Sequence, residues 1–322
     1  YTYTATCSVI CHVGATPVIL DTGKDSYEID YDAIADAVTE RTKVIMPVDI
    51  AGVMCDYDRV FEIIDSKRSL FHPSSEIQEK FGRIIVLADA AHSFGAVRNG
   101  KMSGEAADFT SFSFHAVKNF TTGEGGALVW KTREGIDDDE LYRQFQLMSL
   151  HGQSKDALAK TKAGSWEYDV IEPFYKCNMT DITASIGLAQ MKRYDALLKR
   201  RRDIMQMYYD GLDLRRVSVI THYTDNSTSC GHLCLVRVKG ADRKQCNRII
   251  TAMAEKGVPL NVHFKPLPLL SAYKKLGYDI ADYPNAYEVY SNTVTLPLHT
   301  KLTDEQVRYI IESFNETLDE VL

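Results

Sequence analysis

The sequence IIVLADAAHSFG at residues 84–95 and the sequence FSFHAVKNFTTGEGG at residues 112–126 decide how the chain is interpreted. The first is a short apolar run, typical of a strand buried on both faces, and it ends at the carboxylate of Asp89. The second is an aromatic run that leads to the hydroxyl of Ser113 and then to Lys118, in a loop followed by glycines. Two strands that end in a carboxylate, a hydroxyl and a lysine are typical of an active site.

Short apolar runs alternate with helical patterns through the first half of the chain. We expect strands at residues 18–21, 44–47, 84–88, 108–113 and 126–130. We expect helices at residues 4–13, after a cap at Asp30, at 59–65 and within 141–154. This order predicts an α/β fold with a mainly parallel sheet covered on both faces. Polar residues at the carboxyl ends of its strands are therefore the first candidates for a site.

The second half of the chain has a different pattern. We expect an extended segment at residues 166–174 and one long helix from Thr180–Asp181 to about Tyr209. Strands at 232–238, 258–263 and 292–296, a helix at 242–256 and an amphipathic terminal helix follow. The pattern predicts a large domain over residues 1–205 and a smaller α+β domain over residues 206–322, with the long helix between the two halves.

Composition and charge narrow the classes of function. The chain has 322 residues, of which 45% are hydrophobic, so it can bury a large core. A net charge of -7 at pH 7 argues against a nucleic-acid surface, and no apolar window is as long as a membrane span. The seven cysteines include no CxxC pair and no zinc-ligand spacing, which fits a reducing compartment. We expect a cytoplasmic protein that acts on small molecules and holds no metal.

Lys118 suggests a particular chemistry. A lysine nucleophile forms a Schiff base with a carbonyl, and pyridoxal 5'-phosphate (PLP) is the commonest carbonyl partner that proteins keep bound. The PLP ring needs a carboxylate at its nitrogen, which Asp89 can provide. Ser113 can donate to its phosphate, and Tyr3 and Ala91 can cover its ring faces. On spacing alone, an ordinary solvated lysine explains Lys118 equally well.

The two opening stretches resemble the DegT/DnrJ/EryC1/StrS family of sugar-nucleotide aminotransferases. The resemblance continues, in family order, in the blocks YTAT at 3–6, GATPV at 14–18, NMTDI at 178–182, IG at 186–187 and NVHFKPL at 261–267. It implies the type I aminotransferase fold, with a mainly parallel, seven-stranded-type sheet flanked by helices in a large PLP-binding domain. It also implies a smaller C-terminal α+β domain and PLP as the cofactor.

The resemblance implies separate roles around the cofactor ring. Lys118 would hold PLP as a Schiff base and later move the proton between substrate and cofactor carbons. Asp89 would pair with the ring nitrogen, Ser113 would bind phosphate, and Tyr3 would stack on the ring. His92 stands where many members have glutamine, and it would contact the phenolic oxygen. A packing role for His92 is the alternative.

Two further residues are assigned by the same resemblance. Asn178 would reach the phosphate of the neighbouring subunit, which implies a homodimer with shared active sites. The alternative and compatible role of Asn178 is to cap the helix that begins near Thr180. His263 matches a position near the sugar nucleotide, with a structural role as its rival. We expect His115, although close to Lys118, to be structural.

One family feature is absent from the sequence. Members have a glycine- and serine/threonine-rich turn ahead of the segment that corresponds to Tyr1, and its amides cradle the phosphate. Because the rest of the pattern is intact, we expect that an N-terminal segment is missing from this sequence.

These expectations combine into one function and two rivals. The main expectation is PLP-dependent transfer of an amino group from an amino acid, with glutamate as the expected donor, to a nucleotide-linked keto-sugar in polysaccharide or glycan precursor biosynthesis. The first rival is a sugar dehydratase of the same fold, in whose branch a histidine replaces the lysine, so that Lys118 argues against it. The second is a non-catalytic regulator or scaffold.

Overall fold

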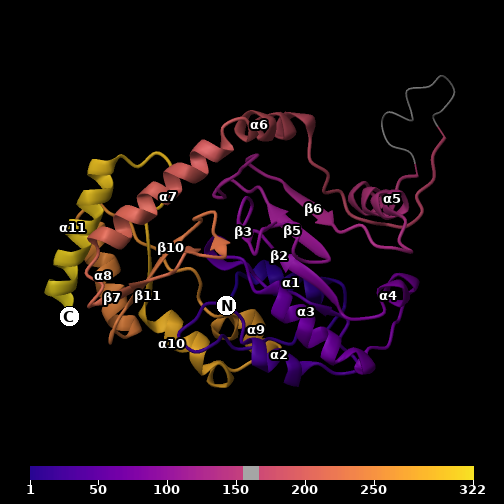
Figure 1. Ribbon diagram of the computed structural model, residues 1–322, viewed down its shortest axis with the longest axis horizontal. Coiled ribbons are helices and arrows are strands. Elements are labelled where there is room, and N and C mark those ends of the chain that lie inside the picture. The colour runs from indigo at the N-terminus through magenta and orange to yellow at the C-terminus, as the bar shows by residue number, and fades with distance from the viewer. Residues whose placement is uncertain (155–166) are drawn as a thin grey trace.

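A four-stranded sheet lies at the centre of the N-terminal half of the molecule (Figure 1). The computed structural model describes residues 1–154 and 167–322. The strands are, in their order across the sheet, β1 (Val44–Ile45), β2 (Ile85–Asp89), β5 (Phe109–Ser113) and β6 (Gly126–Trp130). The first three strands are parallel, whereas β6 runs antiparallel to β5. The chain therefore has a mixed α/β fold, and in the described residues this sheet has four strands rather than seven.

Helices pack around this sheet through apolar faces that match the sequence pattern. They are α1 (Thr4–His12), α2 (Tyr31–Ala37), α3 (Tyr57–Ser66), α4 (Glu76–Phe81) and α5 (Asp138–Ser149), with the 3-10 turns η1 (Ile50–Gly52) and η2 (Arg68–Leu70). Asp30 caps α2, because its side chain accepts the amides of Asp32 and Ala33. Ile34 of α2 and Ile64 of α3 share one buried cluster with Val86 of β2. These helices pack against the sides of the sheet, so the residues at the carboxyl end of β2 can form part of a site.

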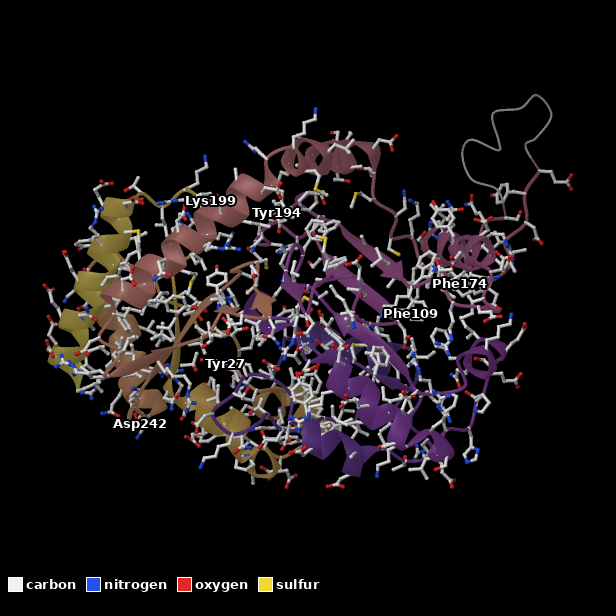
Figure 2. The ribbon with its side chains drawn as sticks, in the orientation of Figure 1. Tyr27, Phe109, Phe174, Tyr194, Lys199 and Asp242 are labelled. Atoms are coloured by element: carbon white, nitrogen blue, oxygen red, sulfur yellow. The ribbon has the colours of Figure 1, made fainter. Side chains whose placement is uncertain are left out.

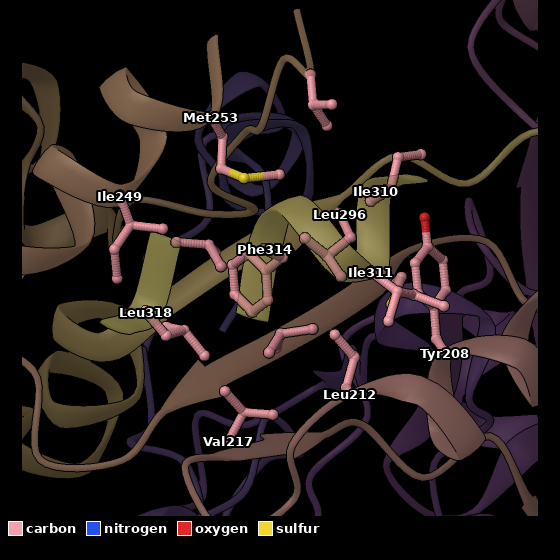
Figure 3. Packing of buried hydrophobic residues seen from close by; sticks show 14 of the residues in the cluster. Tyr208, Leu212, Val217, Ile249, Met253, Leu296, Ile310, Ile311, Phe314 and Leu318 are labelled. Atoms are coloured by element: carbon pink, nitrogen blue, oxygen red, sulfur yellow. The ribbon is translucent and has the colours of Figure 1, made fainter. Parts of the chain in front are cut away.

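The C-terminal part has its own core around an antiparallel sheet. This sheet contains β11 (Thr293–Leu296), β10 (Cys234–Val238) and β7 (Val217–Val219), in that order. The helices are α8 (Arg243–Glu255), α9 (Ser271–Lys275), α10 (Pro284–Asn292) and α11 (Asp304–Val321), with the 3-10 turns η4 (Leu267–Leu269) and η5 (Ile280–Asp282). Phe314 of α11 is fully buried and lies among Ile249, Leu296 and Leu318 (Figure 3).

Two helices connect the halves where the sequence predicts one. They are α6 (Asp181–Met191) and α7 (Tyr194–Gly211), with a break at residues 192–193. Tyr194, at the start of α7 (Figure 2), belongs to the cluster around Phe94 and Phe120, whereas Ile204 belongs to the C-terminal core. The prediction of one continuous helix is wrong, and no proline marks the break. We attribute the break to tertiary packing, since α6 contacts Phe120 through Gly187.

A second four-stranded sheet and a buried arginine join the two halves. The sheet pairs β4 (Lys101–Met102) and β3 (Val97–Arg98) with β9 (Ser227–Thr228) and β8 (Tyr223–Thr224), in that order. Arg201 of α7 is buried, and its Nη1 donates to the carbonyls of Gly231, His232 and Leu298, at 3.1, 3.4 and 3.2 Å. Hydrogen bonds from α7 therefore fix the position of the segment that precedes β10.

Most of the predicted elements are confirmed, with shifts of a few residues at their ends. The helix expected at residues 4–13 is α1, the helix expected at 59–65 is α3, and the strands that flank the opening stretches are β2, β5 and β6. The apolar face of α11 is buried as its pattern predicts. Trp166, where an extended segment was expected to begin, lies outside the described residues.

Two predicted strands are wrong. Residues 18–21 lie outside any strand, and Val18 is 68% exposed. Residues 258–263 form a single bridge, from Asn261 to Thr295, instead of a strand. Both runs contain β-branched residues, but a strand also needs a partner along its length, and the described fold provides none at these places.

Candidate functional site

Asp89 is the last residue of β2, and two hydrogen bonds fix its carboxylate. The hydroxyl of Thr6 on α1 donates to Oδ2 at 2.6 Å, and the backbone amide of Ala91 donates to Oδ1 at 3.1 Å. Each oxygen has one donor, so the carboxylate has a defined orientation and keeps lone pairs for a further donor. Thr6 was not singled out from the sequence, although it lies in the block YTAT.

Lys118 lies in the loop that follows β5, half-buried and near Asp89. Among the described residues its amine makes no hydrogen bond or ion pair. Burial lowers the pKa of the Lys118 ammonium below its usual range, and the negative charge of Asp89 opposes part of that change. A lowered pKa increases the fraction of neutral amine, which is the nucleophilic form. This environment disfavours the reading of Lys118 as an ordinary solvated lysine.

The loop that carries Lys118 is closed at both ends. The amide of Phe114 donates to the carbonyl of Gly125 at 2.8 Å, and the amide of Thr122 donates to the carbonyl of Phe114 at 2.9 Å. A side chain at Gly126 would place its Cβ only 2.6 Å from the carbonyl oxygen of Phe112, so the pairing of β5 with β6 needs glycine here. The glycines that follow Lys118 thus fix the loop rather than loosen it.

His92 is buried, and its tautomer follows from its hydrogen bond. The backbone amide of Ala51 donates to Nδ1 of His92 at 3.2 Å, so the neutral ring carries its proton on Nε2. Burial, and then the positive charge of Lys118, hold the pKa of His92 well below its ordinary value. His92 is therefore a neutral side chain with one N–H donor, the property that a contact with a phenolic oxygen requires.

Tyr3, His92 and His263 meet around Phe264. The ring centroid of Phe264 lies 5.5 Å from that of Tyr3, 5.9 Å from that of His92 and 5.1 Å from that of His263. Nδ1 of His263 lies 3.0 Å from the hydroxyl of Thr295, and burial followed by the charge of Lys118 lowers the pKa of His263 to about 4. Tyr3 is 58% exposed, so one part of its ring is open to a ligand.

Ser113 and Ala91 lie where the sequence predicts, at the ends of the central strands. Ser113 is the last residue of β5 and is half-buried. Its hydroxyl oxygen accepts the amide of His115 at 3.4 Å, which leaves its own proton available to an anion. His115 points to the exposed side, 3.6 Å from the carboxylate of Glu124. A structural role for His115 stays a prediction.

Asn178 does not join the other candidates within one chain. It is exposed, and among the described residues its side chain contacts Lys176 and the carbonyl of Met179. The expected capping role is wrong, because the hydroxyl of Thr180 accepts the amide of Thr183 at the start of α6. The contribution of Asn178 to a neighbouring subunit stays a prediction.

Sequence reasoning missed a second buried imidazole at the site. Nδ1 of His232 lies 2.9 Å from Oδ1 of Asn119, the residue after Lys118, and the ring of His232 lies 4.4 Å from that of His92 between centroids. The available signal was weak: a histidine ahead of the buried strand β10, far along the chain from Lys118.

Asp49 is a buried carboxylate beneath the site. It accepts hydrogen bonds from the hydroxyls of Ser93 and Tyr57, at 2.6 and 2.7 Å, and from the amide of Cys55 at 2.9 Å. Burial nevertheless raises its pKa to about 6. Because Ser93 follows His92, the ionisation of Asp49 acts on the turn that carries the imidazole.

Asp49 predicts an unusual dependence of stability on pH. The folded pKa of about 6 exceeds the ordinary 3.8, so the stabilisation is complete below the unfolded pKa and is lost as pH rises through 6. Relative to Asp49→Asn, the wild type should lose about 2 kcal/mol of unfolding free energy between pH 4 and 7. Urea unfolding at several pH values measures the difference. Exposed Asp36→Asn is the control, and equal slopes for wild type and Asp49→Asn would contradict the prediction.

The described residues hold neither a metal cluster nor a membrane-spanning helix. Among residues 1–154 and 167–322, no group of three or more His, Cys, Asp and Glu side chains is placed to hold a metal ion. The helices of the same residues include none with the length and apolar character to cross a membrane. Surface pockets of 690 and 350 Å³ lie elsewhere, against Arg216 and against Arg83.

Comparison with known proteins decides the family. The family model of the DegT/DnrJ/EryC1/StrS aminotransferase family matches residues 1–315. The chain belongs to this family. The DegT/DnrJ/EryC1/StrS members that resemble it include SpsC of Bacillus subtilis, a spore coat polysaccharide biosynthesis protein that is 35% identical over 322 residues, covering 98% of this chain and 77% of SpsC.

Solved structures of DegT/DnrJ/EryC1/StrS proteins agree with the fold. Spr1654 of Streptococcus pneumoniae, assigned as a sugar aminotransferase, is 55% identical in its PMP form, with a TM-score of 0.97 over 100% of this chain and 80% of that one. Its PLP form is 53% identical, with a TM-score of 0.95 and the same coverage. PseC of Helicobacter pylori, an aminotransferase in pseudoaminic acid biosynthesis, is 26% identical, with a TM-score of 0.83 over 99% of this chain and 78% of PseC.

The chain is therefore a PLP-dependent aminotransferase, and its residues fit that cofactor. An amine with a lowered pKa, an oriented carboxylate at a strand end and a free serine hydroxyl are the groups that a Schiff base, a ring nitrogen and a phosphate require. The neutral imidazole of His92 adds one N–H donor beside them. These residues therefore fit the polar groups of PLP.

Proposed function

We propose that this aminotransferase moves an amino group from an amino acid, with glutamate as the expected donor, to a nucleotide-linked keto-sugar. The observation that carries the proposal is the half-buried amine of Lys118 near the oriented carboxylate of Asp89, in a chain with sugar-aminotransferase relatives. SpsC and PseC support polysaccharide or glycan precursors as the biosynthetic context.

We infer that five residues divide the work at the cofactor. PLP, when bound, acts as an electron sink for the bonds at the substrate carbon. Lys118 attaches the cofactor and then carries a proton at its Nζ. Asp89 keeps the ring nitrogen protonated, and Ser113 binds the phosphate through its free hydroxyl. His92 donates its Nε2 proton to the phenolic oxygen, and Tyr3 covers a ring face.

The substrate end of the site is assigned to His263. This histidine stays neutral near pH 7, since burial lowers its pKa to about 4, and the hydroxyl of Thr295 holds its Nδ1. A neutral imidazole fixed at one nitrogen offers its other nitrogen to a hydroxyl of a sugar without repelling the amine of Lys118.

Absorbance tests the reaction directly. The purified protein loaded with PLP should be yellow and should bleach when glutamate is added, because the amino group then leaves the amino acid. A panel of nucleotide-linked 3-keto and 4-keto sugars should restore the colour with the correct acceptor. A protein that binds PLP but neither bleaches with any amino acid nor aminates any sugar in the panel would contradict the proposal.

We propose that the domain boundary lies near residue 205, inside α7. Tyr194 and Leu198 pack on clusters of the N-terminal half, whereas Ile204, Met205 and Tyr208 pack in the C-terminal core. The change of packing partner along one helix supports domains at residues 1–205 and 206–322. We propose in addition that the fold is the type I aminotransferase fold, in which the four strands described above would be part of a seven-stranded-type sheet.

We also propose a homodimer in which α6 faces the partner. α6 contacts its own chain through Gly187, which lies against Phe120 and Thr122, and through Gln190, whose Oε1 accepts the amide of Thr121 at 3.1 Å. The apolar side chains of the rest of the helix are exposed: Ile182 by 78%, Ile186 by 43%, Leu188 by 70% and Met191 by 52%. Figure 1 shows α6 at the edge of the molecule, directly after the segment that carries Asn178. A second copy that covers α6 would bring Asn178 to the neighbouring site.

The double variant Ile182→Asp, Leu188→Asp should convert the dimer into a monomer, because two charges cannot be buried in an apolar contact without partners. Light scattering after gel filtration measures the mass. Leu214→Asp, at an exposed position of the C-terminal part, should leave the dimer intact. A wild type that is monomeric at high concentration, or a double variant that stays dimeric, would exclude α6 as the interface.

A further inference from the structure

The segment that precedes β10 holds a second imidazole against the candidate site. His232 is only 7% exposed, and its ring lies between Asn119 and His92. Because Nδ2 of Asn119 donates to the carbonyl of Cys230 at 2.8 Å, its Oδ1 is the acceptor for His232. Nδ1 of His232 therefore carries a proton. The two neighbouring imidazoles have opposite tautomers, with the proton on Nδ1 in His232 and on Nε2 in His92.

One residue of η1, Ala51, binds both histidines through its backbone. The amide of Ala51 donates to Nδ1 of His92 at 3.2 Å, and its carbonyl accepts the amide of His232 at 2.9 Å. Ala51 has φ of 56°, a left-handed conformation that is uncommon for a residue with a Cβ. The thiol of Cys230 closes the arrangement, since it donates to the carbonyl of His92 at 2.7 Å. These hydrogen bonds form a continuous network from Asn119 through His232 and Ala51 to His92.

We propose that His232 is a positioning residue of the PLP site, which holds Asn119 beside Lys118 with its Nδ1 proton and fixes the orientation of the His92 ring by a tilted ring-to-ring contact. Its two contacts have different consequences. The hydrogen bond to Asn119 fixes the backbone from which the Lys118 amine projects. The ring contact keeps Nδ1 of His92 against the Ala51 amide, so that the Nε2 proton remains directed to the cofactor. This inference rests on the proposed function for its cofactor, but the His92–His232 contact is independent of PLP.

The charges around the pair support neutral imidazoles. Burial holds the pKa of His232 well below its ordinary value, and the positive charges of Lys118 and Arg201 act in the same direction. His263 also faces the pair. A neutral His232 keeps a single proton, and that proton is on the nitrogen that faces Asn119.

Two substitutions separate the roles. His232→Phe keeps an aromatic ring against His92 but leaves Oδ1 of Asn119 without its donor. His232→Asn places an amide N–H near the position of Nδ1, so it keeps the Asn119 bond but removes the ring. His72→Asn, on the exposed side of the molecule, is the matched control. Urea unfolding of each variant shows whether stability changes.

Two quantities are measured. Nitrogen-15 NMR of labelled histidine gives the tautomer of His92 in the PLP-free protein, and a titration gives the dissociation constant for PLP. In His232→Phe we expect the Nε2–H tautomer of His92 to persist and PLP to bind about tenfold more weakly. In His232→Asn we expect near-normal PLP binding and a mixture of His92 tautomers. The inference is overturned if both variants have the wild-type His92 tautomer and the wild-type dissociation constant for PLP. It is also overturned if the tautomer and the dissociation constant change together in each variant, in proportion to its loss of stability. A wild type that binds no PLP refutes the proposed function, while the tautomer measurement still decides the contact between the rings.

Discussion

Lys118→Ala should yield a colourless protein and lower the rate of amino transfer about a thousandfold or more, because the variant loses both the attachment of PLP and the group that moves the proton. Its fold should persist, because the side chain is half-buried and makes no hydrogen bond among the described residues. Absorbance of the purified variant and single-turnover kinetics with glutamate measure the two effects. Borohydride reduction of the wild type followed by peptide mass spectrometry should place the cofactor on the peptide that contains Lys118.

Lys131 provides a matched control for this experiment. It is another lysine whose pKa is lowered by burial, but it follows β6, which runs antiparallel to β5, so it lies at the opposite end of these strands from Lys118. Its amine donates to the carbonyl of Ala106 at 3.1 Å. Lys131→Ala should keep the colour and the activity. If Lys118→Ala retained the absorbance of the wild type, another lysine would carry the cofactor, and the site described here would be incorrect.

Asp89→Asn should lower kcat about a hundredfold or more, since it replaces a charged hydrogen-bond acceptor in a partly buried site by a neutral amide of the same shape. The protein should still bind PLP, because Lys118 and Ser113 are unchanged. The absorbance of the bound cofactor should shift, as a ring nitrogen without a carboxylate loses its proton more easily. Stopped-flow kinetics and spectra across pH test both expectations.

Two further variants make the test of Asp89 specific. Thr6→Val removes the hydroxyl that donates to Oδ2 at 2.6 Å and should produce a smaller loss of the same kind, because the carboxylate remains but is less well oriented. Asp36→Asn, on the surface, should have no effect. Equal kcat values for wild type and Asp89→Asn would show that another group faces the ring nitrogen.

The local sequence pattern was sufficient to predict an element where its structure depends on nearby residues alone. The apolar face of α11 and the strand that ends at Asp89 are determined by nearby residues, and both were predicted. The strand expected at residues 18–21 failed because Val18 is exposed and lacks a partner strand. The break between α6 and α7 depends on which distant side chains each helix meets, which a periodicity cannot show.

The candidate site shows the same division. The spacing and the family resemblance pointed to Lys118 and Asp89, which lie near each other. The tautomer of His92 was beyond prediction, because it depends on the amide of Ala51, 41 residues earlier in the chain. The contact of Asn119 with His232 spans 113 residues and has no local signature. The residues that we propose to act on the cofactor were visible from the sequence, whereas the residues that orient them were not.

Arg201 gives the joint between the halves a dynamic signature. Its guanidinium donates to the carbonyl of His232. The backbone amide of His232 in turn donates to the carbonyl of Ala51, on the other side of the joint. Deuterium enters the His232 amide when its hydrogen bond to Ala51 opens, and a separation of the two halves at this point would open it. The hydrogen-exchange rate of this amide therefore reports opening of the joint. Bound cofactor should lower that rate more than it lowers the exchange rates of amides in the core around Phe314.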